Sequence, residues 1–286
     1  MNEKNVSEEA SLLTLPVWPG IAPDAPADPP AEIVISDKER LVAGSPVVCL
    51  GNVFKPTLTF YPAKGENSGA AVVVFPGGGY QVLAWDIEGT EACAALSAAG
   101  INCVLLKYRV PATGPYPSSP AALQDAQRAL GVVRSHAAEW KIDPNRIGVL
   151  GFSAGAYLAA ALGTYFAERV YDRMDAADDL SCRPDFSALI YPGYLALKEE
   201  NFALNPAIQP KEKVPPTYLM QTEDDPVGVE NAVVYFMALK EAQVPAELHV
   251  YAQGGHAYGL RPNGLPVATW PESVKTWMRT IKVLPE

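Results

Sequence analysis

Apolar residues in this chain occur in short runs that alternate with longer segments of mixed polarity. Eight runs are predicted to be strands: 47–50, 57–62, 71–75 (AVVVF), 101–108 (INCVLLKY), 146–152, 186–192, 216–221 and 246–251. Five segments between or after them are predicted to be helices: 88–99, 120–139, 154–167, 229–243 and 271–282. Because continuous apolar strands alternate with helices, the pattern predicts a mostly parallel sheet with helices on both faces.

Two stretches fall outside this alternation. Residues 1–30 form a predicted N-terminal arm with six prolines between Pro16 and Pro30, which favour extended backbone. Trp18 within it suggests that the arm lies on the surface of the domain at residues 31–286. The stretch 193–215 leaves the end of a predicted strand, where a small substrate-facing cap would sit.

Composition narrows the function classes. The chain has 286 residues, of which 49% are hydrophobic, enough for one compact domain with a large core. Its net charge of -10 repels phosphate backbones and anionic lipid, so neither nucleic acid nor membrane is an expected partner. The N-terminus lacks a basic segment followed by an apolar one, which predicts a cytoplasmic protein or an exported one already processed.

The four cysteines show no C-x-x-C spacing, and two of them, Cys93 and Cys103, lie within apolar runs. Buried, reduced thiols are therefore expected, because cysteine behaves as a small apolar residue in a core. No metal site is predicted from them.

The segment Gly151-Phe152-Ser153-Ala154-Gly155 matches G-x-S-x-G between a predicted strand and an alanine-rich predicted helix. Such a sharp strand-to-helix turn holds a serine in a strained conformation, so the residues two positions away must lack bulk. This context indicates a nucleophilic serine at position 153.

A second motif, Pro76-Gly77-Gly78-Gly79-Tyr80, follows the apolar strand at 71–75. Consecutive glycines let the backbone approach a reacting carbonyl and direct N–H groups toward its oxygen. The segment lacks the G-x-G-x-x-G or GK[ST] pattern of phosphate-binding loops. It therefore predicts an oxyanion hole, completed by the N–H of the residue after the serine.

A serine hydroxyl needs a base, and the chain has only three histidines to supply one. His136 falls on a predicted helix before the serine, and His249 lies within a predicted strand. His256 follows the last strand in a glycine-flanked loop, which allows its ring to reach the edge of the sheet. His256 is the predicted base.

An acid that orients this base is expected at the end of the preceding strand, where Asp224 and Asp225 lie together. One of the two can instead cap the helix predicted to begin near Val229. The order serine, aspartate, histidine is that of the α/β-hydrolase fold. Between the two aspartates, Asp224 is preferred.

Several stretches resemble one bacterial family of α/β-hydrolases, which contains acetyl esterases, acetylxylan esterases and feruloyl-esterase-like enzymes. The stretches are FPGGGY, LLKYRV, NRIGVLGFSAGAYLAA, RPDFSALIYPG and TEDDPVGVENAVVYF, and the resemblance extends over about residues 15–282. It implies an eight-stranded, mostly parallel sheet with helices on both faces and a small cap. One departure is Ala156-Tyr157, where many relatives have Gly-His after SAG.

The resemblance also implies roles for individual residues. Ser153 would be the nucleophile, His256 the base, and Asp224 the acid, because the family's D-x-x-V pattern ends at Val227. The implied oxyanion donors are Gly78, Gly79 and Ala154. No cofactor and no metal are implied, and the implied substrates are small-molecule or oligosaccharide esters, above all acetyl esters of sugars.

Three alternatives remain open at this point. A feruloyl esterase or a serine peptidase of the prolyl-oligopeptidase type would use the same triad order, although such peptidases carry a large propeller domain that 286 residues cannot hold. A noncatalytic, ligand-binding hydrolase-fold protein would predict a damaged triad, which the motifs do not show. Fold alone does not separate these functions.

Overall fold

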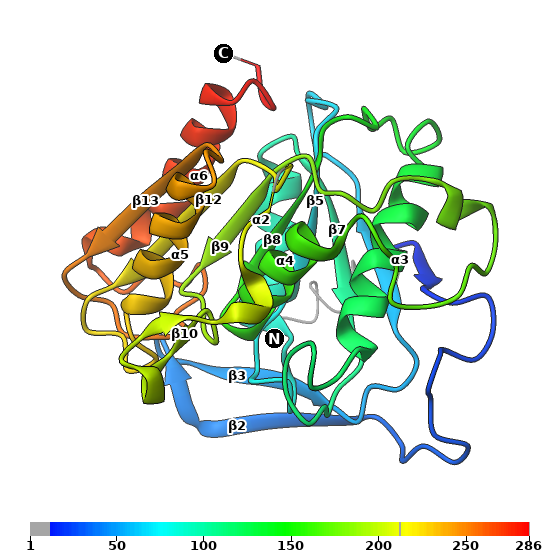
Figure 1. Ribbon diagram of the computed structural model, residues 1–286, viewed down its shortest axis with the longest axis horizontal. Coiled ribbons are helices and arrows are strands. Elements are labelled where there is room, and N and C mark those ends of the chain that lie inside the picture. Colours follow the sequence, from blue (N-terminus) through cyan, green and yellow to red (C-terminus); the bar gives the residue numbers. More distant parts are fainter. Residues whose placement is uncertain (1–11, 212, 286) are drawn as a thin grey trace.

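The computed structural model describes residues 12–211 and 213–285, with the side chains of residues 37–40 left aside. The first 11 residues of the predicted N-terminal arm lie outside this range. An eight-stranded sheet forms the centre of the molecule (Figure 1). Its strands, in spatial order, are β1 (Thr14–Pro16), β4 (Thr57–Tyr61), β7 (Asn102–Lys107), β5 (Ala71–Phe75), β8 (Ile147–Phe152), β9 (Ser187–Ile190), β12 (Thr217–Thr222) and β13 (Ala246–Tyr251).

Only the first two pairings of this sheet, β1 with β4 and β4 with β7, are antiparallel. All the others are parallel, from the β7–β5 pair to the β12–β13 pair. The predicted α/β-hydrolase fold is thus confirmed, but one of the eight strands of the central sheet differs from the prediction. The predicted strand at 47–50 belongs to a separate small sheet, and β1 from the N-terminal arm takes the eighth place.

Helices cover both faces of the central sheet, as the alternation predicted (Figure 1). In β5, Val73 and Phe75 face a core shared with α3, α4 and α5, whereas Val72 and Val74 face a core shared with α2 and α6. None of the helices in the described part of the chain is long and apolar enough to cross a bilayer. The helices are α2 (Glu91–Ala98), α3 (Ala121–Ser135), α4 (Ala154–Tyr165), α5 (Glu230–Glu241) and α6 (Trp270–Thr280).

A small antiparallel sheet of β2 (Ile33–Val42), β3 (Ser45–Gly51) and β6 (Leu83–Ala84) lies beside the glycine loop that follows β5. In Figure 1, β2 and β3 run along the lower edge of the molecule. The π-helical turn η1 (Asp86–Thr90) continues from β6, and the Asp86 carboxylate accepts the Val48 N–H at 3.0 Å. The small sheet is thereby held against the segment between β5 and α2.

The predicted cap segment, 193–215, is short and lies close to α5. It contains the strand pair β10 (Ala196–Leu197) and β11 (Ala203–Leu204) with the 3-10 turns η3 (Lys198–Glu200) and η4 (Pro206–Ile208). Two further 3-10 turns are η2 (Ala176–Asp179) and η5 (Pro266–Thr269).

The described part of the N-terminal arm is fastened to the domain. Besides the β1 pairing, Trp18 is only 3% exposed, and its indole N–H donates to the Asp125 carboxylate at 2.7 Å. Asp125 is itself buried and paired with Arg109. The arm therefore takes part in a buried polar network through Trp18. The expectation that the arm lies on the surface of the domain agrees with this packing, and part of the arm forms strand β1.

The expectation of four reduced cysteines is wrong, because Cys93 and Cys103 form a disulfide. Cys93 lies on α2 and Cys103 on β7, with their Cα atoms 5.2 Å apart. A spacing of ten residues has no characteristic motif, and the pairing arises only when α2 packs on the sheet. The bond therefore joins a helix to a buried strand.

Removing this disulfide with the double substitution Cys93→Ala and Cys103→Ala is expected to lower Tm by about 5–10 °C, because the unfolded chain gains entropy. Thermal unfolding followed by circular dichroism measures the shift. The single variant Cys182→Ala, which removes another buried sulfur, is the control for lost packing. Equal shifts in the two variants would contradict a stabilising cross-link.

Candidate active site

Ser153 stands at the junction of β8 and α4, with φ 51° and ψ -114°. The strain is held by close packing on both sides of the turn. A Cβ at Gly151 would lie 2.1 Å from the Gly155 carbonyl oxygen, and one at Gly155 would lie 2.1 Å from the Phe75 carbonyl oxygen. Both flanking positions therefore require glycine, as the G-x-S-x-G motif predicted.

His256 reaches Ser153 from the loop after β13. Its Nε2 lies 2.8 Å from the serine Oγ, a hydrogen-bond distance. The Tyr191 ring packs edge-on against the imidazole, with the ring centres 5.0 Å apart. The other histidines lie elsewhere: His136 ends α3 and contacts Val132, and His249 pairs with Glu247 on β13. The structure thus brings together the predicted serine and the predicted histidine.

The aspartate that contacts His256 is Asp225, and the preference for Asp224 is wrong. Asp225 Oδ2 lies 2.8 Å from His256 Nδ1, and its side chain is fully buried. Gln221 Nε2 donates to the same oxygen at 3.1 Å, and the Val227 N–H donates to Oδ1 at 2.8 Å. These two donors and His256 hold the carboxylate in a fixed orientation.

Asp224 turns the other way and holds the histidine loop from outside. Its carboxylate accepts the N–H groups of Gly254 and Gly255, at 3.0 and 2.8 Å. The Gly255 N–H in particular keeps the pKa of Asp224 below its usual range. In the turn after β12, Asp225 contacts His256 whereas Asp224 contacts the backbone of the histidine loop. A D-x-x-V spacing does not show which of the two contacts the histidine.

The glycine loop lies directly against the serine. A Cβ at Gly77 would be 2.8 Å from the Ser153 Cβ, and one at Gly78, where φ is 126°, would be 2.1 Å from the Val82 carbonyl oxygen. Within the described residues, no acceptor pairs with the amide N–H of Gly78, Gly79 or Ala154. These amides are therefore available to a ligand beside the serine.

A pocket of about 250 Å³ surrounds the serine and histidine. Gly78 and Gly79 form part of its wall, and the small β2–β3–β6 sheet contributes apolar side chains that the motif analysis did not identify. No local signal in the sequence marks these positions, because β3 reaches the pocket only by pairing with β6. The apolar side chains from the small sheet are those of Val47, Cys49 and Ala84, and Val82 before β6 and Ile87 in η1 complete this side of the pocket.

Tyr157, at the departure from the Gly-His pattern, does not enter this pocket. Its side chain is buried, and its hydroxyl donates to the Tyr116 carbonyl oxygen at 2.6 Å. Its ring packs edge-on against Tyr194, which follows β9. At this departure Tyr157 packs outside the pocket, and Ser153 and His256 remain within hydrogen-bond distance.

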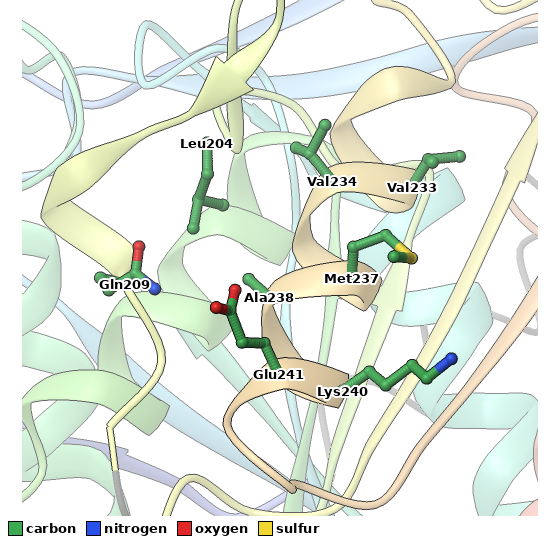
Figure 2. A pocket seen from close by; sticks show the side chains of 8 residues that line it. All are labelled: Leu204, Gln209, Val233, Val234, Met237, Ala238, Lys240 and Glu241. Carbon is green, nitrogen blue, oxygen red and sulfur yellow. The ribbon is translucent and has the colours of Figure 1, made fainter.

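A larger hollow, of about 590 Å³, lies along the outer side of α5 (Figure 2). Val233, Val234 and Met237 of α5 form one side of it, and Leu204 lies opposite. Among the described residues, the titratable groups that line it are Lys240 and Glu241 at one end. Because it lacks a nucleophile with a base, the smaller pocket at Ser153 is the candidate active site.

Comparisons with known proteins agree with this fold. The BD-FAE family model matches residues 59–191. An acetylxylan esterase of Xylanibacter ruminicola is 29% identical over 221 residues, which are 68% of this chain and 42% of that protein. An endo-1,4-beta-xylanase B of Butyrivibrio fibrisolvens is 30% identical over 221 residues, 71% of this chain and 34% of that protein. The chain thus spans less than half the length of these two relatives.

A solved structure matches over nearly the whole length of both chains. It is an acetyl ester-xyloside bifunctional hydrolase from Caldicellulosiruptor lactoaceticus, 32% identical, with a TM-score of 0.74. The match covers 95% of this chain and 97% of that one. From this similarity and from its sheet order, the chain belongs to the family of α/β-hydrolase esterases that includes acetylxylan esterases.

Proposed function

We propose that this protein is a serine carboxylesterase that hydrolyses short acyl esters through a triad of Ser153, His256 and Asp225. The observation that carries the proposal is the continuous line of hydrogen bonds from the serine Oγ through the imidazole to a buried carboxylate, 2.8 Å at each step. A serine in this setting is far more nucleophilic than one in water.

In the first half-reaction, Asp225 accepts the Nδ1–H of His256 and so leaves the Nε2 lone pair facing Ser153. The serine Oγ attacks the ester carbonyl while Nε2 takes the hydroxyl proton. The tetrahedral intermediate collapses as the imidazolium returns that proton to the departing alcohol. An acyl-serine and a free alcohol result.

In the second half-reaction, water takes the place of the alcohol. His256 removes a proton from the water, the resulting hydroxide attacks the acyl-serine, and the proton goes to the Ser153 Oγ as the carboxylic acid leaves. In both steps the amide N–H groups of Gly78, Gly79 and Ala154 stabilise the oxyanion. Each such donor contributes about 3 kcal/mol to transition-state binding.

The substrate class follows from the pocket and from the relatives. The pocket of about 250 Å³ beside Ser153 is lined by Val47, Val82 and Ile87, and its small volume suits a short acyl group. Because related proteins are named acetylxylan esterase and acetyl ester-xyloside hydrolase, we assign acetyl esters on carbohydrate hydroxyls as the preferred substrates. The negative net charge suits a neutral substrate of this kind.

Two measurements test this function. A fluorophosphonate probe is expected to label Ser153 stoichiometrically, with the label located by peptide mass spectrometry. Rates on acetylated xylo-oligosaccharide, methyl ferulate and a peptide substrate then separate the acetyl esterase from the feruloyl esterase and the peptidase. Failure to label would favour a noncatalytic protein, and faster turnover of methyl ferulate or peptide would contradict the assigned substrate.

Acyl length provides a further prediction. kcat/KM is expected to fall by about tenfold or more from p-nitrophenyl acetate to p-nitrophenyl octanoate, because a small apolar pocket discriminates by about 1–3 kcal/mol for a misfitting methylene. Val82→Ala, which widens the pocket, should raise the ratio of butyrate to acetate rates. Val233→Ala on the outer side of α5 is the matched control and should leave it unchanged. A preference for octanoate in the unaltered protein would refute the short-acyl assignment.

A further inference from the structure

A buried carboxylate, Glu88 in η1, lies beside the glycine loop at the wall of the Ser153 pocket and has no role in the proton transfers above. Only 1% of the surface of Glu88 is exposed to solvent. Its Oε2 accepts the Gly77 N–H at 2.7 Å, and its Oε1 accepts the Tyr191 hydroxyl at 2.9 Å. The two oxygens thus contact two different parts of the active site.

The first contact sets the orientation of the glycine loop. Gly77 immediately precedes Gly78, and its carbonyl accepts the Ala84 N–H at 2.9 Å. Both backbone groups of Gly77 are therefore held, its N–H by Glu88 and its C=O by β6. With Gly77 packed against the Ser153 Cβ, these bonds determine where the following amides point.

The second contact leads to the catalytic histidine. Tyr191, at the end of β9, donates to Glu88 and accepts the Gly259 N–H at 3.2 Å. Its ring packs against the His256 imidazole, with the centres 5.0 Å apart. Tyr191 thus touches both the histidine ring and the loop that carries it.

The charge of Glu88 suits this arrangement. Burial, and next the Glu88 carboxylate, raise the pKa of Tyr191 well above its ordinary value, so the phenol remains a donor. Burial and then Glu88 likewise raise the pKa of Tyr108, whose hydroxyl donates to the Pro76 carbonyl at the start of the loop. Burying a carboxylate is unfavourable unless several donors compensate it. Here the donors come from segments that meet only at the active site.

We propose that Glu88 is a positioning residue that holds the oxyanion loop and, through Tyr191, the catalytic histidine in one fixed arrangement around Ser153. The proposal rests on the proposed esterase function. It assigns Glu88 no contact with substrate. Its effect on catalysis comes from the preorganisation of donors that must not move when negative charge develops on the substrate oxygen.

The test is Glu88→Gln, which preserves size. A glutamine amide has one acceptor oxygen and one NH₂ group, so it cannot accept from both the Gly77 N–H and the Tyr191 hydroxyl. We expect kcat/KM for p-nitrophenyl acetate to fall by about tenfold or more. This decrease should be smaller than the decrease of about 10²–10³-fold that follows removal of a whole oxyanion donor. KM should change little, and the Ki of a boronic acid transition-state analogue should rise by a similar factor.

Active-site titration separates positioning from folding. Rates are expressed per serine labelled by the fluorophosphonate probe, so loss of folded protein lowers the number of sites but not the rate per site. Asp125→Asn changes another fully buried carboxylate, which binds Trp18 and does not line the pocket, and it should lower Tm while the rate per site stays within about threefold.

Tyr191→Phe tests the second contact, because it keeps the ring on His256 and removes the hydroxyl. A loss of about three- to tenfold is expected, and the loss should be smaller when Glu88→Gln is already present, since both changes break one linkage. Normal rates per site in Glu88→Gln, or fully additive losses in the double variant, would overturn the proposal. If the unaltered protein fails to react with the probe, the proposed function fails first.

Discussion

Replacing Ser153 by alanine is expected to lower kcat/KM for p-nitrophenyl acetate by about 10⁴–10⁶-fold, the range seen when a triad nucleophile is removed. Without the Oγ no acyl-enzyme can form, and the residual rate comes from the oxyanion donors alone. The effect is measured by steady-state kinetics at enzyme concentrations high enough to detect the residual rate. Loss of fluorophosphonate labelling provides a second measurement.

Ser187→Ala is the matched control. Ser187 is buried in β9, and within the described residues its hydroxyl has no hydrogen-bond partner. Its removal should therefore leave both kcat/KM and Tm nearly unchanged. Circular dichroism of both variants verifies the fold. Persistent turnover by folded Ser153→Ala would eliminate the assigned nucleophile and, with it, the proposed mechanism.

Asp225→Asn is expected to lower kcat by about 10³–10⁴-fold, because the amide no longer fixes the Nδ1–H tautomer or stabilises the imidazolium. The buried carboxylate contacts His256 at 2.8 Å and also accepts from Gln221 and Val227. Steady-state kinetics on p-nitrophenyl acetate measure the loss, and active-site titration confirms that the serine remains accessible.

Asp224→Asn is the neighbouring control and should change kcat by no more than about threefold, since its amide oxygen still accepts from Gly254 and Gly255. The lowered pKa of Asp224 adds a pH signature. The contribution of ionised Asp224 to the free energy of unfolding is fully present above the pKa of an aspartate in the unfolded chain. It is lost as the pH falls through the lower pKa that Asp224 has in the folded protein. A larger loss in Asp224→Asn than in Asp225→Asn would restore Asp224 as the acid.

Much of the fold was predictable because it depends on local pattern. The buried parallel strands are apolar throughout, and each is followed by a segment of helical period, so β5, β8 and β12 appear in the sequence with nearly their structural bounds. The strand pairing of β1 was not predictable. Three residues within a proline-rich arm carry no strand signal, and β1 forms because the edge of β4 is available to it.

The active site divides in the same way. Ser153 was identified because the steric demands of its turn appear in consecutive residues, and His256 because only three histidines exist and one alone follows the required strand order. The choice between Asp224 and Asp225 depends on which way each side chain leaves a turn, which adjacent aspartates do not reveal.

The sequence by itself predicted the class of fold and pointed to Ser153, His256 and the glycine loop as the proposed nucleophile, base and oxyanion site, since each depends on residue type and spacing along one segment. Only the tertiary structure showed which aspartate contacts His256, the Cys93–Cys103 disulfide, the apolar wall from the small sheet and the position of Glu88. Each of these depends on contacts between different elements of the fold, and such contacts arise only when the packed elements bring them together.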